Sequence, residues 1–284
     1  MLSLQTITPA LRQWIVEQSR AGHRPEVVLE AMKSSGWREE VALAALDTVL
    51  RELAKDAVPA PAAEPTQPLP EPDLSGAPAT LWAHDREVRV VLSLHEPRVV
   101  VFAGLLSDAE CDELVELARP RLQRSHTVDT ATGDSEINAA RTSEGMFFAR
   151  GEHPVCALLE ARIAALLHWP LEHGEGLQVL HYRPGAEYKP HYDYFDPAQS
   201  GTPTILKRGG QRVATVLIYL NTPERGGATS FPDVKLEVAA QKGYAVFFSY
   251  DRPHPSTRSL HGGAPVLAGE KWVATKWLRV ARFD

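Results

Sequence analysis

The spacing of apolar residues predicts regions of different character along the chain. In residues 1–56 the apolar positions recur at helical spacing in three segments, 9–21, 25–32 and 39–53, which is typical of amphipathic helices. Gly22 interrupts the pattern after the first segment, and Gly36 lies at the turn before the third. We therefore expect a small bundle of three helices in this part of the chain.

Residues 57–79 show no such period. They contain seven prolines together with alanines and scattered acidic residues. This composition cannot bury a core and favours an extended, semi-rigid chain. We expect a linker here, and it is the clearest domain boundary in the sequence.

From residue 80 the pattern changes to short β-rich runs with glycine-rich turns. The predicted strands are 88–92, 98–102, 177–182, 212–220, 243–249 and 272–280. Helices are predicted at 107–117, where Ser107 and Glu110 form a capping box, and at 154–167. Many short strands, with helices confined to the front, predict an α+β domain over residues 80–284 with a β-sandwich or jelly-roll core.

Composition and charge exclude several functional classes. The 284 residues carry a formal net charge of −6, whereas nucleic-acid binding needs a basic face. No apolar run approaches the roughly 20 residues that span a bilayer, and the first residues lack the pattern of a signal peptide. Cys111 and Cys156 have no metal-ligand spacing and are expected to be reduced thiols. We therefore expect a cytoplasmic protein with no nucleic-acid or membrane partner.

The His191-Tyr192-Asp193 sequence offers two candidate metal ligands. On a strand, residues i and i+2 point to the same face, so the imidazole and the carboxylate converge. A second histidine would complete a triad that leaves three coordination positions open, which suits Fe(II) oxygenases. His254, between two prolines, and His261, before two glycines, compete for that place. A chance surface pair is the alternative interpretation of the His-x-Asp sequence.

Lys271 follows His261 by ten residues and abuts an apolar stretch. A dicarboxylate that chelates iron through one carboxylate and its keto oxygen needs a cation several ångströms away for its far carboxylate. A lysine on a buried strand supplies that cation through a charge-assisted hydrogen bond. A solvated surface lysine is the alternative, and the apolar residues beside Lys271 favour the first interpretation.

Six ordered stretches between residues 94 and 279 carry a resemblance to a known family. The stretches are 141–147, 175–182, 188–195, 211–215, 226–232 and 265–272. Together they resemble the catalytic domain of prolyl 4-hydroxylases, which include collagen-type, plant, algal and bacterial enzymes. The resemblance implies a double-stranded β-helix, or jelly-roll, core with supporting helices.

The resemblance also implies roles for individual residues. The implied iron ligands are His191, Asp193 and His261. The implied 2-oxoglutarate ligands are Lys271, Tyr182 and Thr229. The implied substrate surface consists of Arg141, Ser143, Glu175, Tyr188, Arg212 and Trp277. At some positions a structural role is the alternative. Tyr188 and Trp277 could be core aromatic residues, Arg141 and Arg212 could be surface cations, and Thr229 could be an ordinary strand threonine.

The implied activity is hydroxylation of prolyl residues in a peptide or protein. The implied cofactors are Fe(II), 2-oxoglutarate, O2 and ascorbate, with succinate and CO2 released. The alternatives are the same chemistry on another residue or a small molecule, a non-catalytic binding or sensing module, and a zinc hydrolase. Residues 1–56 resemble small modules related to ubiquitin-associated domains, and we expect them to recruit a protein partner or to act as a passive stability or dimerisation element.

Overall fold

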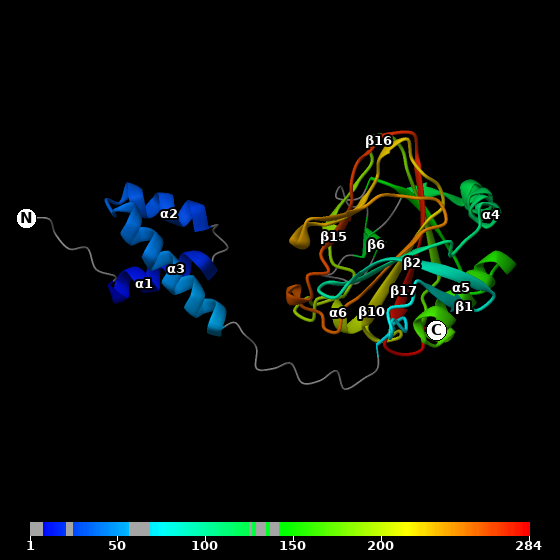
Figure 1. Ribbon diagram of the computed structural model, residues 1–284, viewed down its shortest axis with the longest axis horizontal. Coiled ribbons are helices and arrows are strands. Elements are labelled where there is room, and N and C mark those ends of the chain that lie inside the picture. Colours follow the sequence, from blue (N-terminus) through cyan, green and yellow to red (C-terminus); the bar gives the residue numbers. More distant parts are fainter. Residues whose placement is uncertain (1–7, 21–24, 57–68, 125–126, 129–134, 137–141) are drawn as a thin grey trace, which may run out of the picture. The chain divides into compact units, whose positions relative to one another are not determined.

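The chain divides into two compact units, Met1–Thr66 and Gln67–Asp284 (Figure 1). The computed structural model describes residues 8–20, 25–56, 69–124, 127–128, 135–136 and 142–284. Among the helices in these ranges, none combines the length and apolar character needed to cross a membrane.

The first unit contains the three helices that the sequence predicts. They are α1 (Pro9–Arg20), α2 (Pro25–Ser34) and α3 (Glu39–Asp56). Their apolar sides share one small core, formed by Leu11, Ile15, Val28, Met32, Ala42, Ala45, Leu46 and Val49. Burial of these sides stabilises helices that would be marginal alone. The likeness to ubiquitin-associated modules stays a prediction.

The second unit is built on two antiparallel sheets. The larger sheet has the spatial order β1 (Thr80–Ala83), β2 (Arg86–Leu94), β3 (Arg98–Ala103), β14 (Ala245–Ser249), β10 (Arg212–Tyr219), β17 (Lys271–Arg279), β8 (Leu177–Tyr182), β7 (Glu144–Phe148) and β4 (Gln123–Arg124). The smaller sheet has the order β13 (Leu236–Val238), β12 (Thr229–Phe231), β15 (His261–Gly263) and β9 (Tyr188–His191). Two further strand pairs are β11 (Arg225–Gly226) with β16 (Val266–Ala268), and β5 (Thr127–Val128) with β6 (Ser135–Glu136).

Two helices, α4 (Asp108–Ala118) and α5 (Pro154–Leu167), pack on the outer face of the larger sheet, and β15 lies toward its other face (Figure 1). The short helix α6 (Thr202–Ile205) follows β9. Helix α4 begins with the predicted capping box, in which the Ser107 N–H donates to the Glu110 carboxylate at 2.7 Å and the Glu110 N–H donates to Ser107 Oγ at 3.3 Å. The α+β jelly roll with supporting helices is therefore confirmed.

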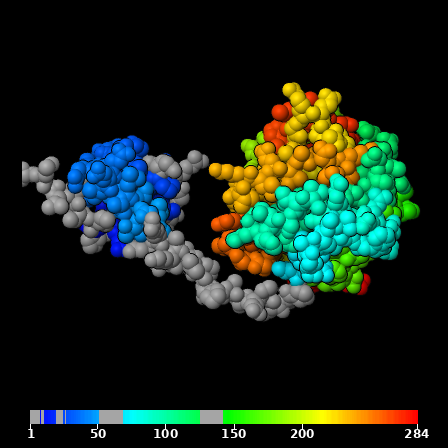
Figure 2. Space-filling view, viewed as in Figure 1, coloured from blue at the N-terminus to red at the C-terminus, as the bar shows by residue number. Residues whose placement is uncertain are grey.

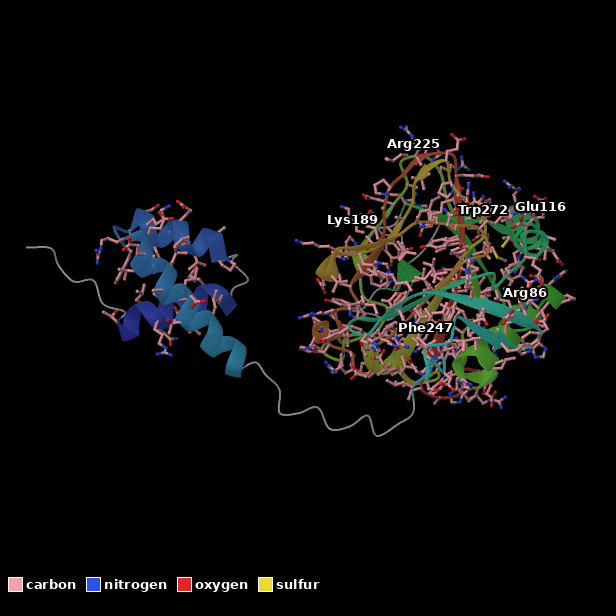
Figure 3. The ribbon with its side chains drawn as sticks, viewed as in Figure 1. Arg86, Glu116, Lys189, Arg225, Phe247 and Trp272 are labelled. Atoms are coloured by element: carbon pink, nitrogen blue, oxygen red, sulfur yellow. The ribbon has the colours of Figure 1, made fainter. Side chains whose placement is uncertain are left out.

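The central strand β10 of the larger sheet is apolar on both faces. On β10, Val216 and Ile218 join the core beneath the helices, whereas Leu217 and Tyr219 join the core between the two sheets. Alternation with a period of two divides the residues in this way, and burial on both sides explains the nearly continuous apolar run. Figure 3 shows Phe247 of β14 inside the body and Arg225 projecting from it.

Residues 69–79 belong to the second unit, although the sequence predicted a free linker over 57–79. Leu69 and Leu74 pack against the core beneath the helices, and Glu71 forms an ion pair with Arg98. These apolar residues, placed between the prolines, anchor the segment by burial. Its cyan atoms and those of β1 and β2 form one continuous surface (Figure 2). Residues 57–68 lie outside the described ranges, so the linker stays a prediction there.

Candidate metal centre and its pocket

Strands β9 and β15 place two histidines opposite each other. His191 ends β9, His261 begins β15, and the two are partners in the antiparallel register. Gly262 permits the close approach, because a Cβ atom there would lie 2.9 Å from the Tyr188 carbonyl oxygen. Lys189, also on β9, points outward from the body (Figure 3). Gly262, directly after His261 in the sequence, thus has a packing role.

His191, Asp193 and His261 bring three ligand atoms within 4.8 Å of one another. His191 Nε2 lies 3.6 Å from Asp193 Oδ1, and His261 Nε2 lies 3.4 Å from Asp193 Oδ2. The Nδ1 atoms lie 2.9 Å from the Lys189 carbonyl oxygen and 3.0 Å from the Ser259 carbonyl oxygen, respectively. A carbonyl oxygen only accepts, so each Nδ1 carries the proton and each Nε2 keeps its lone pair for a metal.

The electrostatics of the triad favour its ligating form. Burial by itself raises the pKa of Asp193, but the neighbouring imidazoles, His261 first and then His191, hold that pKa well below its usual range. Burial, and then the neighbouring His261, lower the pKa of His191. An ionised carboxylate with two imidazole nitrogens is the donor set of a facial triad, so these residues fit Fe(II). His254 is exposed, and its Nδ1 accepts from the Ser256 N–H instead.

A pocket of about 440 Å³, counted with the open space at its mouth, adjoins the triad. Lys271 lines it, and its side chain is only 2% exposed. The Lys271 Nζ atom lies 5.4 Å from the centre of the Tyr182 ring and 5.6 Å from that of Tyr219. Burial alone lowers the pKa of Lys271 to about 8, and no acidic group in the described chain opposes that effect. A buried cation without a carboxylate is unfavourable unless an anion binds beside it.

A cluster of two arginines and one glutamate lies beside the pocket. The Glu175 carboxylate accepts from Arg212 Nε at 2.7 Å, from Arg212 Nη2 at 3.0 Å and from Arg279 Nε at 2.6 Å. The Arg212 guanidinium lies 3.9 Å from the centre of the Trp277 ring, and its Nη1 donates to the Asp193 carbonyl oxygen at 3.3 Å. Glu175 and Arg212 thus contact each other, and they hold neighbours of the triad in place.

Most of the predicted site residues lie in this one pocket. The residues that line it include His191, Asp193, His261, Lys271, Tyr182, Thr229, Tyr188 and Trp277. Ser143 is fully buried and is not among the lining residues, and neither are Glu175 and Arg212. Arg141 lies outside the described residues. The sequence did not predict a role for Arg279, although an arginine at the end of an apolar strand was an available signal.

Two residues near the triad were not predicted, of which Thr215 contacts Asp193 directly and Tyr250 contacts Thr215. The Thr215 hydroxyl donates to Asp193 Oδ2 at 2.7 Å and lies 3.1 Å from the Tyr250 hydroxyl. The available signal for Thr215 was its place as the one threonine in the apolar run 213–220. No sequence pattern marked Tyr250.

Comparison with known proteins agrees with this geometry. The family described as "2OG-Fe(II) oxygenase superfamily" matches residues 177–279. Prolyl 4-hydroxylase 2 of Arabidopsis thaliana is 40% identical over 212 residues, which cover 66% of this chain and 69% of that protein. Prolyl 4-hydroxylase 5 of the same plant is 42% identical over 209 residues, which cover 66% and 70%.

A solved structure is also similar. It is the viral collagen prolyl hydroxylase vCPH from Paramecium Bursaria Chlorella virus-1 in its 2OG complex, which is 31% identical, with a TM-score of 0.49 over 64% of this chain and 94% of that chain. The identity to the plant proteins extends over more than two thirds of their length. The chain therefore belongs to the prolyl 4-hydroxylase family of 2-oxoglutarate- and Fe(II)-dependent dioxygenases.

Proposed function

We propose that the protein hydroxylates prolyl residues in a peptide or protein, with Fe(II), 2-oxoglutarate and O2, and releases succinate and CO2. One observation carries the proposal. The His191–Asp193–His261 triad and the buried Lys271, which has no acidic partner among the described residues, line the same pocket. A metal with open positions and a cation in the same cavity match the two ends of 2-oxoglutarate.

The triad would hold the iron through both Nε2 atoms and the Asp193 carboxylate. When bound with 2-oxoglutarate and O2, Fe(II) supplies the oxidising power for hydroxylation of a C–H bond. The protein supplies orientation, because the two Nδ1 hydrogen bonds fix the plane of each imidazole. The Phe248 ring, 4.5 Å from that of His261, packs against the second histidine and keeps it in place.

Lys271, Thr229 and Tyr182 would bind the far carboxylate of 2-oxoglutarate. Thr229 Oγ1 accepts from the Tyr219 hydroxyl at 2.7 Å, so its own proton can be donated to a carboxylate oxygen. Tyr182 is the partner of Lys271 in the β8–β17 register. The apolar side chains of Leu180 and Val273 in the wall exclude water and strengthen these charged contacts.

Tyr188 and Trp277 would position the substrate at the mouth of the pocket. The Tyr188 ring stacks on His191 with 3.7 Å between the ring centres, and aromatic faces pack well against a prolyl ring. Trp277 Nε1 is buried without a hydrogen-bond partner in the described chain, so it can donate to a substrate carbonyl. Arg212 would hold the Trp277 ring in place by packing against it, and Glu175 would hold Arg212 by accepting its hydrogen bonds. Roles for Ser143 and Arg141 in substrate binding stay predictions.

Three further predictions belong to the proposal. Ascorbate as a further cofactor follows from the family alone. A cytoplasmic location is supported by Cys111 and Cys156, which are free and buried. A protein partner for the three-helix unit is supported by Val27 and Leu43, which are large apolar residues exposed on α2 and α3.

The test is turnover of proline-containing peptides by the wild-type protein and by Asp193→Ala. The wild type should form succinate and add one oxygen atom to proline, and a peptide with alanine in that place should stay unmodified. Asp193→Ala should form no succinate above background, because one metal ligand is lost, while its circular dichroism stays that of the wild type. Oxygen found on another residue would correct the substrate, and turnover by Asp193→Ala would contradict the site.

A further inference from the structure

The Thr215 hydroxyl connects the two sheets at the triad. Thr215 lies on β10 of the larger sheet, and Asp193 follows β9 of the smaller sheet. Thr215 is 1% exposed, and its hydrogen bond to Asp193 Oδ2 is 2.7 Å long. A hydroxyl–carboxylate bond of this length between buried groups is strong, because the acceptor is charged and water does not compete.

Tyr250 follows β14, the neighbour of β10 in the larger sheet, and its ring is 2% exposed. Its N–H donates to the Val213 carbonyl oxygen at 3.0 Å, which fixes its position beside β10. The Tyr250 hydroxyl lies 3.1 Å from Thr215 Oγ1. The Thr215 hydroxyl has one proton, and that proton points to Asp193. Tyr250 is therefore the donor to Thr215.

We infer that Tyr250 and Thr215 form a directed hydrogen-bond relay that engages Asp193 Oδ2 and fixes the orientation of the carboxylate, which favours ligation of the metal through Oδ1. The inference rests on the metal site of the proposed function. Tyr250 and Thr215 are positioning residues, because each acts on the metal through Asp193.

One-oxygen ligation matters for the chemistry of the site. A facial triad is useful only while three of six coordination positions stay open for the cosubstrates. A carboxylate that ligates through both oxygens takes one of those positions. The relay opposes this, because the Thr215 hydroxyl competes with the metal for Oδ2 from the larger sheet. The Arg212 contact with the Asp193 carbonyl oxygen fixes the backbone of the same residue.

The test uses the full chain and Co(II) as the probe, without 2-oxoglutarate, and measures the affinity and the visible spectrum. Thr215→Val keeps the shape but removes the hydroxyl. It should weaken Co(II) binding about ten- to hundredfold, as loss of a hydrogen bond to a ligand does, and should change the spectrum, which reports coordination number. Thr215→Ser keeps the hydroxyl and should restore both.

Tyr250→Phe tests the second step of the relay. Alone it should weaken Co(II) binding by a factor of about three to ten, and in the Thr215→Val background it should add nothing, because its route to Asp193 is already broken. The matched controls are Thr202→Val, a buried threonine of α6 outside the pocket, and Tyr194→Phe, whose ring lies 6.0 Å from that of Tyr250. Both should keep the wild-type spectrum, and thermal unfolding of the metal-free proteins should show that every variant is folded.

Two results would overturn the relay. One is a Thr215→Val protein with wild-type affinity and spectrum, and the other is an equal effect of Tyr250→Phe in both backgrounds. A different result identifies failure of the proposed function. If wild type and His191→Ala bind Co(II) equally, the triad is not a metal site, and the inferred role of the relay is then wrong as well. Should Thr215→Val not fold, Thr215→Ser and Tyr250→Phe still decide the question, because the relay predicts retention in the first and loss in the second.

Discussion

Two buried lysines on strand β17 meet opposite surroundings. Lys276 and Lys271 are each 2% exposed. Lys276 Nζ donates to Glu160 of α5 at 2.5 Å, beneath the helices. Lys271 faces the pocket between the sheets, where no carboxylate of the described chain meets it. One strand therefore carries a compensated cation on one face and an uncompensated cation on the other.

The difference distinguishes a lysine with a structural role from a lysine with a functional role. A buried ion pair that is complete contributes to a single packed arrangement, whereas a buried charge without a partner lowers stability. A fold tolerates a buried charge without a partner where a ligand supplies the opposite charge, and such groups are frequent at functional sites. The Lys276–Glu160 pair thus belongs to the scaffold, and Lys271 belongs to the site.

The largest expected effect comes from breaking the complete pair. Lys276→Met should lower the free energy of unfolding by about 3–5 kcal/mol, because Glu160 is left buried and unpaired. Denaturant unfolding measures the change. The double variant Lys276→Met/Glu160→Gln should recover part of the loss, since the amide oxygen can still accept from the Gly151 N–H. Equal stability of wild type and Lys276→Met would show that the pair is not structural.

The pH dependence of stability should reveal the incomplete cation. The pKa of Lys271 is about 8 in the fold and 10.5 as its ordinary value, so the unfolded chain binds the proton more tightly. Burial of the protonated Lys271 therefore lowers the free energy of unfolding by about 3 kcal/mol below pH 8, and this loss disappears as the pH rises to 10.5. The free energy of unfolding of wild type minus that of Lys271→Met should therefore rise over this range. A constant difference would contradict the burial of an unpaired ammonium.

Lys271→Met should also weaken 2-oxoglutarate binding. Loss of a charged hydrogen bond is worth about 1.5–3 kcal/mol, which is roughly a ten- to hundredfold rise in Kd. Calorimetric titration of the metal-loaded protein measures it. Lys276→Met, if folded under these conditions, is the matched control and should keep the wild-type affinity. Unchanged affinity in Lys271→Met would remove the main support for the cosubstrate pocket.

The smallest expected effect comes from removing the three-helix unit. Deletion of residues 1–66 should leave uncoupled 2-oxoglutarate turnover within about twofold of wild type, because every residue of the pocket lies in the second unit. Deletion of residues 1–79 should in addition lower the melting temperature, since it removes the buried parts of Leu69 and Leu74. If the shorter deletion unfolds the protein, the two units are not independent.

The sequence by itself determined the elements and the donor set. Helical and alternating periods place α1 to α5 and the main strands, because burial of one face or of both leaves a period in the sequence. His191 and Asp193 could be paired because they are two residues apart. The expectation that both lie on one strand was wrong, because β9 ends at His191 and Asp193 lies in the bend after it. The order of motifs then indicated His261 and Lys271 through the family resemblance.

Only the tertiary structure decided which long-range partners those residues have. Lys271 and Lys276 are both lysines in the same apolar strand, and the contrast between them depends on Glu160, more than a hundred residues earlier in the chain. The pairing of Glu175 with Arg279, the anchoring of residues 69–79 and the contact of Thr215 with Asp193 are decided in the same way. Each joins elements that are distant in sequence, and local periodicity carries no information about which distant side chains meet when two sheets close on each other.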